Sequence, residues 1–302
     1  MSADEGMKIL VVSGFLGAGK TTFIESIVKN TDMFSVILEN EYGELGIDGD
    51  ILKKDNNSNV WELTEGCICC SMKANFATSV MTINNTINPE LLIVEPTGIG
   101  MLSSIMKNID KVKYDRIRIL EPITIVDPYN IELYMNEYMD IFKDQVENSK
   151  NIIISKTSLY STDIVEHSVK LLRRMNPNAT IHCKDFFEYD RSWYEEILNS
   201  SWDNRCKNQN TDIDIDIENI SFRDVEFDSL YEFESYMGAI MQGRFGNVIR
   251  VKGFAIINGV WSKVDIVGKS YTLEKIDIMK ESKIILIGSN LLKKDLEAIF
   301  SK

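Results

Sequence analysis

The chain has 302 residues, 44% of them hydrophobic, which is enough for two packed domains or for one large α/β domain with an appendage. Its formal net charge of -13 argues against a nucleic-acid partner, because phosphate backbones are bound by basic surfaces. The five cysteines are odd in number and three of them crowd into one short segment, which favours reduced thiols or metal ligands over a disulfide framework. An acidic start and the lack of an apolar run near ~18 residues predict a cytoplasmic protein without a secretory leader or a membrane span.

Six apolar, β-prone runs follow one another in the first half of the chain, with stretches typical of helices between them. They cover residues 8–12, 34–38, 60–63, 91–94, 117–126 and 151–154. Runs this apolar are typical of strands that are buried on both faces, as in a parallel sheet with helices above and below it. We therefore expect an α/β domain with a mostly parallel sheet over about residues 1–190.

The pattern changes after residue 182. The polar stretch 199–212 has the composition of a linker, which we assign to residues 191–214. Beyond it, Asn258 and Gly259 predict a tight hairpin turn. The elements expected around that turn are a strand with alternating Ile and acidic residues over 212–218, a helix over 229–241, strands over 248–257, 260–267 and 283–287, and a helix over 291–300. They predict a smaller α+β domain over residues 215–302, with a client-docking or regulatory surface.

Residues 14–21 read GFLGAGKT and match the GxxxxGK[ST] phosphate-binding loop, between a predicted strand and a predicted helix. The glycines allow the backbone to curl so that consecutive N–H groups point inward at phosphate. Lys20 is expected to reach the β and γ phosphates, and Thr21 to place its hydroxyl on Mg²⁺. The nucleotide contacts predicted from this loop are Gly14, Gly17, Ala18, Gly19, Lys20, Thr21 and Thr22.

A carboxylate stands at the end of the later apolar run LLIVE. Glu95 ends this run, and Gly98 follows three residues on, which is the acidic-x-x-Gly spacing of GTPase switches. We expect Glu95 to belong to the magnesium shell and Gly98 to sense the γ-phosphate. Together with Lys20, they are the predicted catalytic residues. Asp127, at the end of the next apolar run, is the competing carboxylate, and we interpret it as a helix cap before Pro128.

Three cysteines form the cluster CICC, and their thiolates would make a soft chelate for Zn²⁺, Co²⁺ or Cu⁺. Cys67, Cys69 and Cys70 are too close for disulfides among themselves, and three ligands leave one metal position open. Neither His167 in a predicted helix nor His182 at a strand end is expected to be a ligand. Reversible oxidation of Cys69 or Cys70 is the alternative role.

Four motifs in this order resemble the CobW-type family of P-loop GTPases, the cobalamin-synthesis-protein-like metallochaperones. They are GFLGAGKTT, ENEYGELGID (39–48), EGCICC (65–70) and EPTG (95–98), and VIRVKG (248–253) with IILIGSNL (284–291) extends the resemblance over nearly the whole chain. The resemblance implies GTP and Mg²⁺ as ligands, a transition metal at Cys-x-Cys-Cys, and hydrolysis coupled to delivery of that metal. It also implies Cys69 as the central thiol, Cys67 and Cys70 beside it, and Glu39 and Glu44 as auxiliary ligands for Zn²⁺ or Co²⁺.

The base-reading motif departs from the family pattern Asn-Lys-x-Asp. The matching residues here begin with Ser155 and Lys156, so Lys156 can still lie along the base, but Ser158 stands where the carboxylate is expected. Loss of a charged acceptor removes about 1.5–3 kcal/mol from such a contact. We therefore expect a weak preference for GTP over ATP, unless Asp163 or Asp185 substitutes.

These observations predict a nucleotide-dependent metallochaperone that hydrolyses GTP and delivers a transition metal to, or activates, a metal or cofactor enzyme. The expected partner is that client enzyme, with a homodimer as a possible assembly and no nucleic acid or membrane. The alternative is a nucleotide-gated metal sensor or storage protein with negligible turnover. A small-molecule kinase on the same scaffold is disfavoured because the sequence carries no Arg-rich lid segment.

Overall fold

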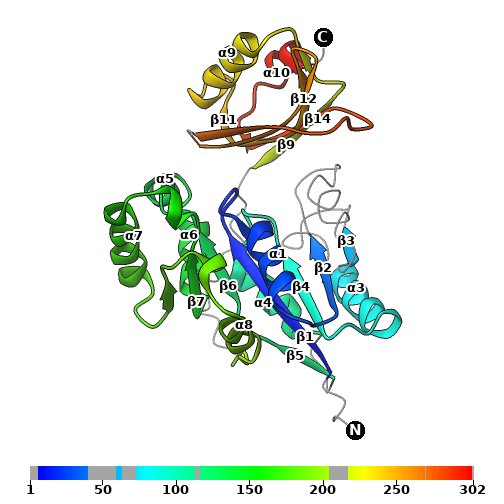
Figure 1. Cartoon of the computed structure of the whole chain (residues 1–302), viewed down its shortest axis with the longest axis vertical. Helices are drawn as coiled ribbons and strands as arrows, with labels where there is room; N and C mark the ends of the chain where they lie inside the picture. The colour runs from blue at the N-terminus through cyan, green and yellow to red at the C-terminus, as the bar shows by residue number, and fades with distance from the viewer. Residues whose placement is uncertain are drawn as a thin grey trace. The chain divides into compact units, whose positions relative to one another are not determined.

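The computed structural model describes residues 6–39, 59–62, 73–112, 116–203, 217–268 and 270–300. The chain divides into two compact units, one that holds the described residues up to 203 and one that holds those from 217 onward (Figure 1). Within the described part of the chain, no helix is long and apolar enough to span a membrane.

An eight-stranded sheet forms the centre of the first unit, in the order β3-β2-β4-β1-β6-β7-β8, with β5 paired to β1. All of these pairings are parallel. The strands are β1 (Met7–Gly14), β2 (Ser35–Glu39), β3 (Asn59–Glu62), β4 (Leu91–Glu95), β5 (Ile117–Ile119), β6 (Ile123–Val126), β7 (Asn151–Ile154) and β8 (Thr180–His182). The predicted parallel α/β sheet is confirmed, and one predicted strand is divided into β5 and β6 where Pro122 removes a backbone donor.

Helices cover both faces of this sheet (Figure 1). Alternate residues of β1 point to opposite faces: Ile9 and Val11 pack with α3 and α4, while Leu10 and Val12 pack with α1 and α8. The helices are α1 (Lys20–Asn30), α3 (Lys73–Thr86), α4 (Leu102–Asp110), α5 (Ile131–Glu137), α6 (Met139–Glu147), α7 (Thr162–Met175) and α8 (Arg191–Leu198), with short 3₁₀ turns η1 (Thr157–Leu159) and η2 (Phe186–Glu188). The carboxyl ends of the strands therefore meet at one edge, where β1 leads into α1.

The second unit is a six-stranded sheet with two helices. Its order is β13-β12-β11-β14-β9, antiparallel throughout, and β10 adds to β11 in parallel. Its elements are β9 (Glu218–Arg223), β10 (Glu226–Phe227), α9 (Leu230–Met241), β11 (Asn247–Ile257), β12 (Val260–Val267), β13 (Ser270–Lys275), β14 (Lys283–Ser289) and α10 (Lys293–Phe300). Phe233 and Met237 of α9 and Leu296 of α10 pack on Val251 of β11, so the predicted α+β architecture is confirmed.

The segment between the units begins later than the predicted linker. Residues 191–198 form α8, and Tyr194, Ile197 and Leu198 are buried in the core of the first unit. Trp202 is also buried, and its backbone N–H donates to the carbonyl of Ile119. The apolar residues of α8 recur at helical spacing, and this signal is stronger than the polar residues that surround it. The expected strand over 212–218 lies mostly outside the described residues.

Candidate nucleotide-binding site

The phosphate-binding loop connects β1 to α1. Gly14, Gly17 and Gly19 have φ angles of 140°, 68° and 98°, which side chains other than glycine rarely adopt. A Cβ on Gly14 would lie 2.3 Å from the carbonyl oxygen of Ile125, so the loop also needs glycine for close packing. The helix α1 begins at Lys20, and among the described residues no side chain caps this end. Its first N–H groups are therefore suited to an anion.

Three side chains predicted to hold phosphate and Mg²⁺ lie together. Lys20 is buried, and its Nζ lies 3.9 Å from Glu95 Oε1 and 3.3 Å from the carbonyl of Phe15. The Thr21 hydroxyl lies 3.2 Å from both carboxylate oxygens of Glu95. A hydroxyl and a carboxylate at this separation are oxygen ligands of the kind that Mg²⁺ prefers. Thr22, also predicted to contact nucleotide, is exposed in the first turn of α1.

Gly98 lies directly against the phosphate-binding loop. A Cβ at this position would lie 2.4 Å from the backbone nitrogen of Leu16, so only glycine fits here. The chain turns at this point, because the N–H of Gly100 donates to the carbonyl of Thr97 at 2.9 Å. The turn that follows Glu95 is thus in contact with the loop that would hold the phosphates, as a γ-phosphate sensor requires.

The loop after β7 is tied to the same phosphate-binding loop. The Ser155 hydroxyl donates to the carbonyl of Ala18 at 2.6 Å. Lys156 Nζ donates to the carbonyl of Gly17 at 2.9 Å and to Asp127 Oδ2 at 2.8 Å. These contacts place the two residues matched to the base-reading motif beside the phosphate site, although Ser155 replaces the expected Asn.

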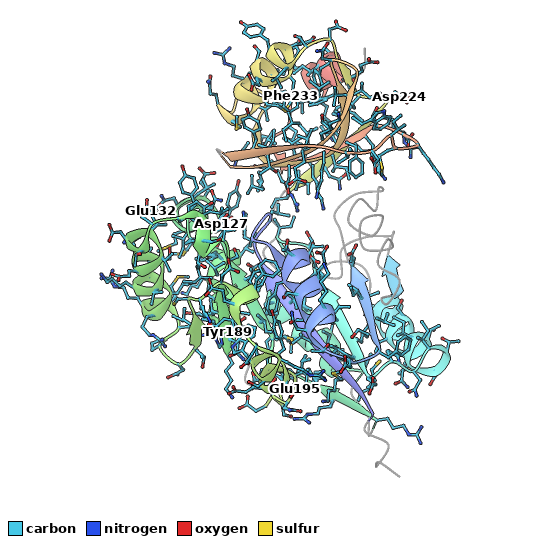
Figure 2. All side chains as sticks on the ribbon, in the orientation of Figure 1. Asp127, Glu132, Tyr189, Glu195, Asp224 and Phe233 are labelled. Carbon is cyan, nitrogen blue, oxygen red and sulfur yellow. The ribbon has the colours of Figure 1, made fainter. Side chains whose placement is uncertain are left out.

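Asp127 has a different role from the helix cap that the sequence suggested. The cap position of α5 is Asn130, whereas Asp127 Oδ1 accepts the backbone N–H of Tyr129 at 3.0 Å. Its Oδ2 forms the ion pair with Lys156, and the side chain is almost fully buried. Asp127, labelled in Figure 2, therefore orients Lys156 and leaves Glu95 as the carboxylate beside Thr21. The Asp-Pro sequence is a local signal for the bond between Asp127 and the backbone N–H of Tyr129. The ion pair with Lys156 depends on tertiary packing and has no such signal.

Asp163 and Asp185 are the two acids named above as substitutes for the missing base-reading carboxylate, and the structure describes both. Ser158 is exposed in η1. Asp185 accepts the backbone N–H of Phe187 at 3.2 Å and so caps η2. Asp163 is exposed in the first turn of α7, where a negative charge is favourable to the helix dipole. Each of the two acids thus has a local structural role of its own.

Two tyrosines stack beside this loop. Tyr129 and Tyr160 have ring centroids 5.4 Å apart and planes inclined by 8°. Burial, and then the nearby charge of Asp127 and the hydroxyl of Tyr129, raise the pKa of Tyr160 to about 12. The Tyr160 hydroxyl consequently stays neutral over the physiological range.

The predicted transition-metal ligands lie mostly outside the described residues. These are Cys67, Cys69, Cys70 and Glu44. Glu39 is described: it ends β2, is buried, and pairs in register with Glu95 on the neighbouring strand β4. In the described ranges, no group of three or more His, Cys, Asp or Glu could hold a metal, and the cysteine that they include, Cys183, is a free, exposed thiol.

The sheet order, the glycine loop between β1 and α1, and the Thr21–Glu95 contact define a P-loop nucleotide-binding protein. Residues 8–183 match the family model for the CobW/HypB/UreG nucleotide-binding domain, and residues 217–302 match the cobalamin synthesis protein cobW C-terminal domain. The chain belongs to the CobW family.

Several characterised proteins are similar to this chain. The zinc chaperone CobW of Sinorhizobium sp is 28% identical over 178 residues, which cover 49% of this chain and 50% of that protein. The zinc chaperone YjiA of Escherichia coli K12 is 28% identical over 185 residues, covering 58% and 56%. The zinc-regulated GTPase metalloprotein activator 1 of Schizosaccharomyces pombe is 27% identical over 190 residues, covering 60% and 46%. The chain spans about half the length of the curated relatives that it matches.

Among solved structures, the Zn(II)-bound YjiA GTPase from E. coli aligns with a TM-score of 0.47 at 19% identity over 98% of each chain. The hydrogenase maturation factor HypB from Archaeoglobus fulgidus aligns with a TM-score of 0.45 at 14% identity, covering 65% of this chain and 92% of that one.

Proposed function

We propose that this protein binds and hydrolyses GTP with Mg²⁺ and couples hydrolysis to the delivery of Zn²⁺ to a client metalloprotein. The observation that carries the proposal is the contact of Thr21 with Glu95 at the P-loop of a CobW-family chain. Relatives named as zinc chaperones and as a zinc-regulated GTPase metalloprotein activator support zinc as the cargo.

The chain's own residues have separate roles in this proposal. The backbone N–H groups at the start of α1 and the Lys20 ammonium bind the phosphates. Thr21 and Glu95 hold Mg²⁺, which neutralises charge on the β and γ phosphates when it is bound. Lys20 now lies near Glu95, so binding of the magnesium nucleotide would move the ammonium to phosphate and the carboxylate to the metal ion. Gly98 senses the γ-phosphate, and Ser155 and Lys156 support the base side.

The proposed zinc site joins the thiols of Cys67, Cys69 and Cys70 to the carboxylates of Glu39 and Glu44. Thiolates favour Zn²⁺ or Co²⁺ over Mg²⁺ at such a site. Glu39 and Glu95 occupy paired positions on neighbouring strands, so a metal ligand and a magnesium ligand would share one edge of the sheet. If zinc and the nucleotide favour the same conformation of these segments, binding of each must alter the affinity for the other, typically by about 5–150-fold.

The test is a competition titration of zinc against a chromophoric chelator, under anoxic conditions, in the empty, GDP and GTP-analogue states. We expect the analogue to tighten zinc binding relative to GDP, Cys69→Ala to remove most of the affinity, and Glu44→Ala to weaken it less. Cys183→Ala is the matched control, because it removes an exposed thiol of the same unit that lies outside the motif. Equal affinity in all three states, or zinc binding that survives Cys69→Ala, would replace this proposal with a redox or structural role.

Turnover separates the proposed chaperone from a metal sensor. A chaperone should hydrolyse GTP faster when zinc or its client is present. A sensor or storage protein should bind both ligands with hydrolysis at background. A pull-down in the presence of zinc and the GTP analogue would identify the client. Light scattering in the same nucleotide states would show whether the protein forms a homodimer.

A further inference from the structure

Two consecutive residues of α6 hold the turn that follows Glu95. Gln145 Nε2 donates to the carbonyl of Gly98 at 3.1 Å and to that of Gly100 at 3.0 Å. Asp144 Oδ2 accepts the backbone N–H of Ser103, in the first turn of α4, at 3.0 Å. Both side chains are almost fully buried, and α6 lies against α4 and β1. The whole segment from Gly98 to Ser103 is therefore attached to one helix.

The orientation of the Gln145 amide is fixed by these contacts. Both hydrogens of Nε2 are used, whereas Oε1 is buried and has no hydrogen-bond partner among the described residues. A flipped amide would place Oε1 against the carbonyl oxygens of Gly98 and Gly100, which offer no proton. In the part of the chain that the structure describes, Oε1 of Gln145 therefore stays without a hydrogen bond while Nε2 binds the carbonyls of Gly98 and Gly100. This cost indicates that glutamine is needed at this position for its contacts with the turn.

Helix α5, which precedes α6 in the chain, and Tyr138 between these two helices contact the phosphate-binding loop. The ring of Phe15 packs on Tyr134 of α5 at 4.3 Å and on Tyr138 at 5.2 Å, between ring centroids. The Tyr134 hydroxyl donates to the carbonyl of Leu16 at 3.5 Å. Gly98 also lies against Leu16. The phosphate-binding loop, the turn after Glu95 and the helices α5 and α6 therefore all contact one another.

We propose that Gln145 is a positioning residue for recognition of the triphosphate. With Asp144 it holds the turn over residues 97–100 against the phosphate-binding loop, so that Gly98 stays within reach of the third phosphate. This inference rests on the proposed function, in which Gly98 senses that phosphate. A nucleoside diphosphate lacks the third phosphate that this turn would contact. The affinity of the protein for GDP should therefore depend little on Gln145.

The test compares nucleotide affinities of the full chain and its Gln145→Met variant, which keeps side-chain volume and removes both donors. Dissociation constants for GDP and for a non-hydrolysable GTP analogue are measured with Mg²⁺ by fluorescence titration. We expect the analogue-to-GDP preference to fall at least about fivefold, with GDP affinity nearly unchanged. Lys143→Gln, on the same helix, is the matched control and should leave the preference intact.

A second variant keeps the inference testable if Gln145→Met fails to fold. Asp144→Asn replaces one oxygen of the carboxyl group that accepts the backbone N–H of Ser103 by an amide nitrogen, and we expect a smaller loss of preference in the same direction. Equal weakening of both nucleotides, or an unchanged preference, would overturn the positioning role. If the wild type prefers the analogue and the variants keep that preference, only this inference fails. If the wild type binds no triphosphate, the proposed function fails with it.

Discussion

Lys156 shows how one side chain can keep its place while its neighbours in a motif change. Its ammonium is shared between the carbonyl of Gly17 and the buried carboxylate of Asp127, so its position does not depend on the missing base-reading carboxylate. Ser155 likewise bonds to the phosphate-binding loop through its hydroxyl. The loop after β7 therefore retains its contacts to the phosphate site, and what it lacks is the charge that would distinguish guanine.

Ser158→Asp should restore a preference for GTP over ATP. A carboxylate here could accept two hydrogen bonds from the guanine edge, and a charge-assisted contact of this kind contributes about 1.5–3 kcal/mol, so the gain should be roughly tenfold to a hundredfold. Competition of GTP and ATP for a fluorescent nucleotide measures it. Leu159→Asp adds the same charge one residue further on, at a position that is 72% exposed, and should leave the preference unchanged. A wild type that already rejects ATP several hundredfold would show that another residue reads the base.

His182 is held in its neutral form. Trp193 Nε1 donates to Nδ1 at 3.3 Å, and Nε2 meets Asn151 Oδ1 at 3.1 Å, so the tautomer with a proton on Nε2 satisfies both nitrogens. Burial lowers the pKa of His182 from 6.5, and the nearby charge of Glu196 offsets part of this effect. The unfolded chain therefore binds more protons than the folded chain between the lowered pKa and 6.5.

The stability contributed by neutral His182 should accordingly be fully present above about pH 6.5 and be lost as the pH falls through that window. We expect the free energy of unfolding of wild-type protein to decline on acidification more steeply than that of His182→Gln. Urea unfolding followed by tryptophan fluorescence between pH 5 and 7.5, about the range in which histidine titrates, measures the difference. Parallel slopes for wild type and His182→Gln would contradict the assignment.

At the scale of elements, the sequence predicted those parts of the fold that depend on local pattern. The apolar runs became strands of a parallel sheet, and the glycine loop between strand and helix has the expected φ angles. Helix α8 was assigned to the linker because the polar composition that follows it was extended over residues whose apolar positions recur at helical spacing. The contacts of Gln145 with the turn after β4 could not be predicted, because they join residues 45 and 47 positions apart in the chain. Such contacts are fixed by packing, for which a single sequence carries no direct signal.

The hairpin between β11 and β12 confirms the Asn-Gly turn prediction. Asn258 and Gly259 have φ angles of 49° and 74°, and Ile257 pairs directly with Val260. A Cβ added to Gly259 would meet nothing within 4 Å, so the effect of substitution comes from the backbone conformation alone. Gly238 in α9 also has open space around it, but its φ angle is not positive.

The two glycines should respond to alanine with opposite signs. Gly259→Ala should destabilise the second unit by about 1 kcal/mol, since a left-handed conformation is unfavourable for a residue with a Cβ. Gly238→Ala should stabilise it by roughly 0.5–1 kcal/mol, because alanine loses less backbone entropy in a helix. Thermal unfolding of each full-length variant measures both changes, and each variant is the matched control of the other. A shift of the same sign in both would show that packing, and not the backbone, decides at one of the sites.

At the scale of the whole molecule, the two units have separate hydrophobic cores. Among the described residues, the buried clusters on the parallel sheet consist of first-unit residues, and the cluster on the antiparallel sheet consists of second-unit residues. The residues that we propose to bind nucleotide lie in the first unit. Nucleotide binding should therefore stabilise the two units to different extents, and this difference can be measured segment by segment.

A ligand that binds only the folded first unit stabilises it by about 2.7 kcal/mol at a hundredfold excess over its dissociation constant. We expect a GTP analogue with Mg²⁺ to slow amide hydrogen exchange in β1, α1 and β4 and to leave β11, β12 and β14 unchanged, as measured by mass spectrometry. The reason is that each unit's most protected amides open only when its own core unfolds. Lys20→Ala should abolish the effect of the nucleotide, because its ammonium would bind the phosphates. Protection that rises equally in β11, β12 and β14 would show instead that both cores unfold as one cooperative unit, so that nucleotide bound to the first unit also stabilises the C-terminal sheet.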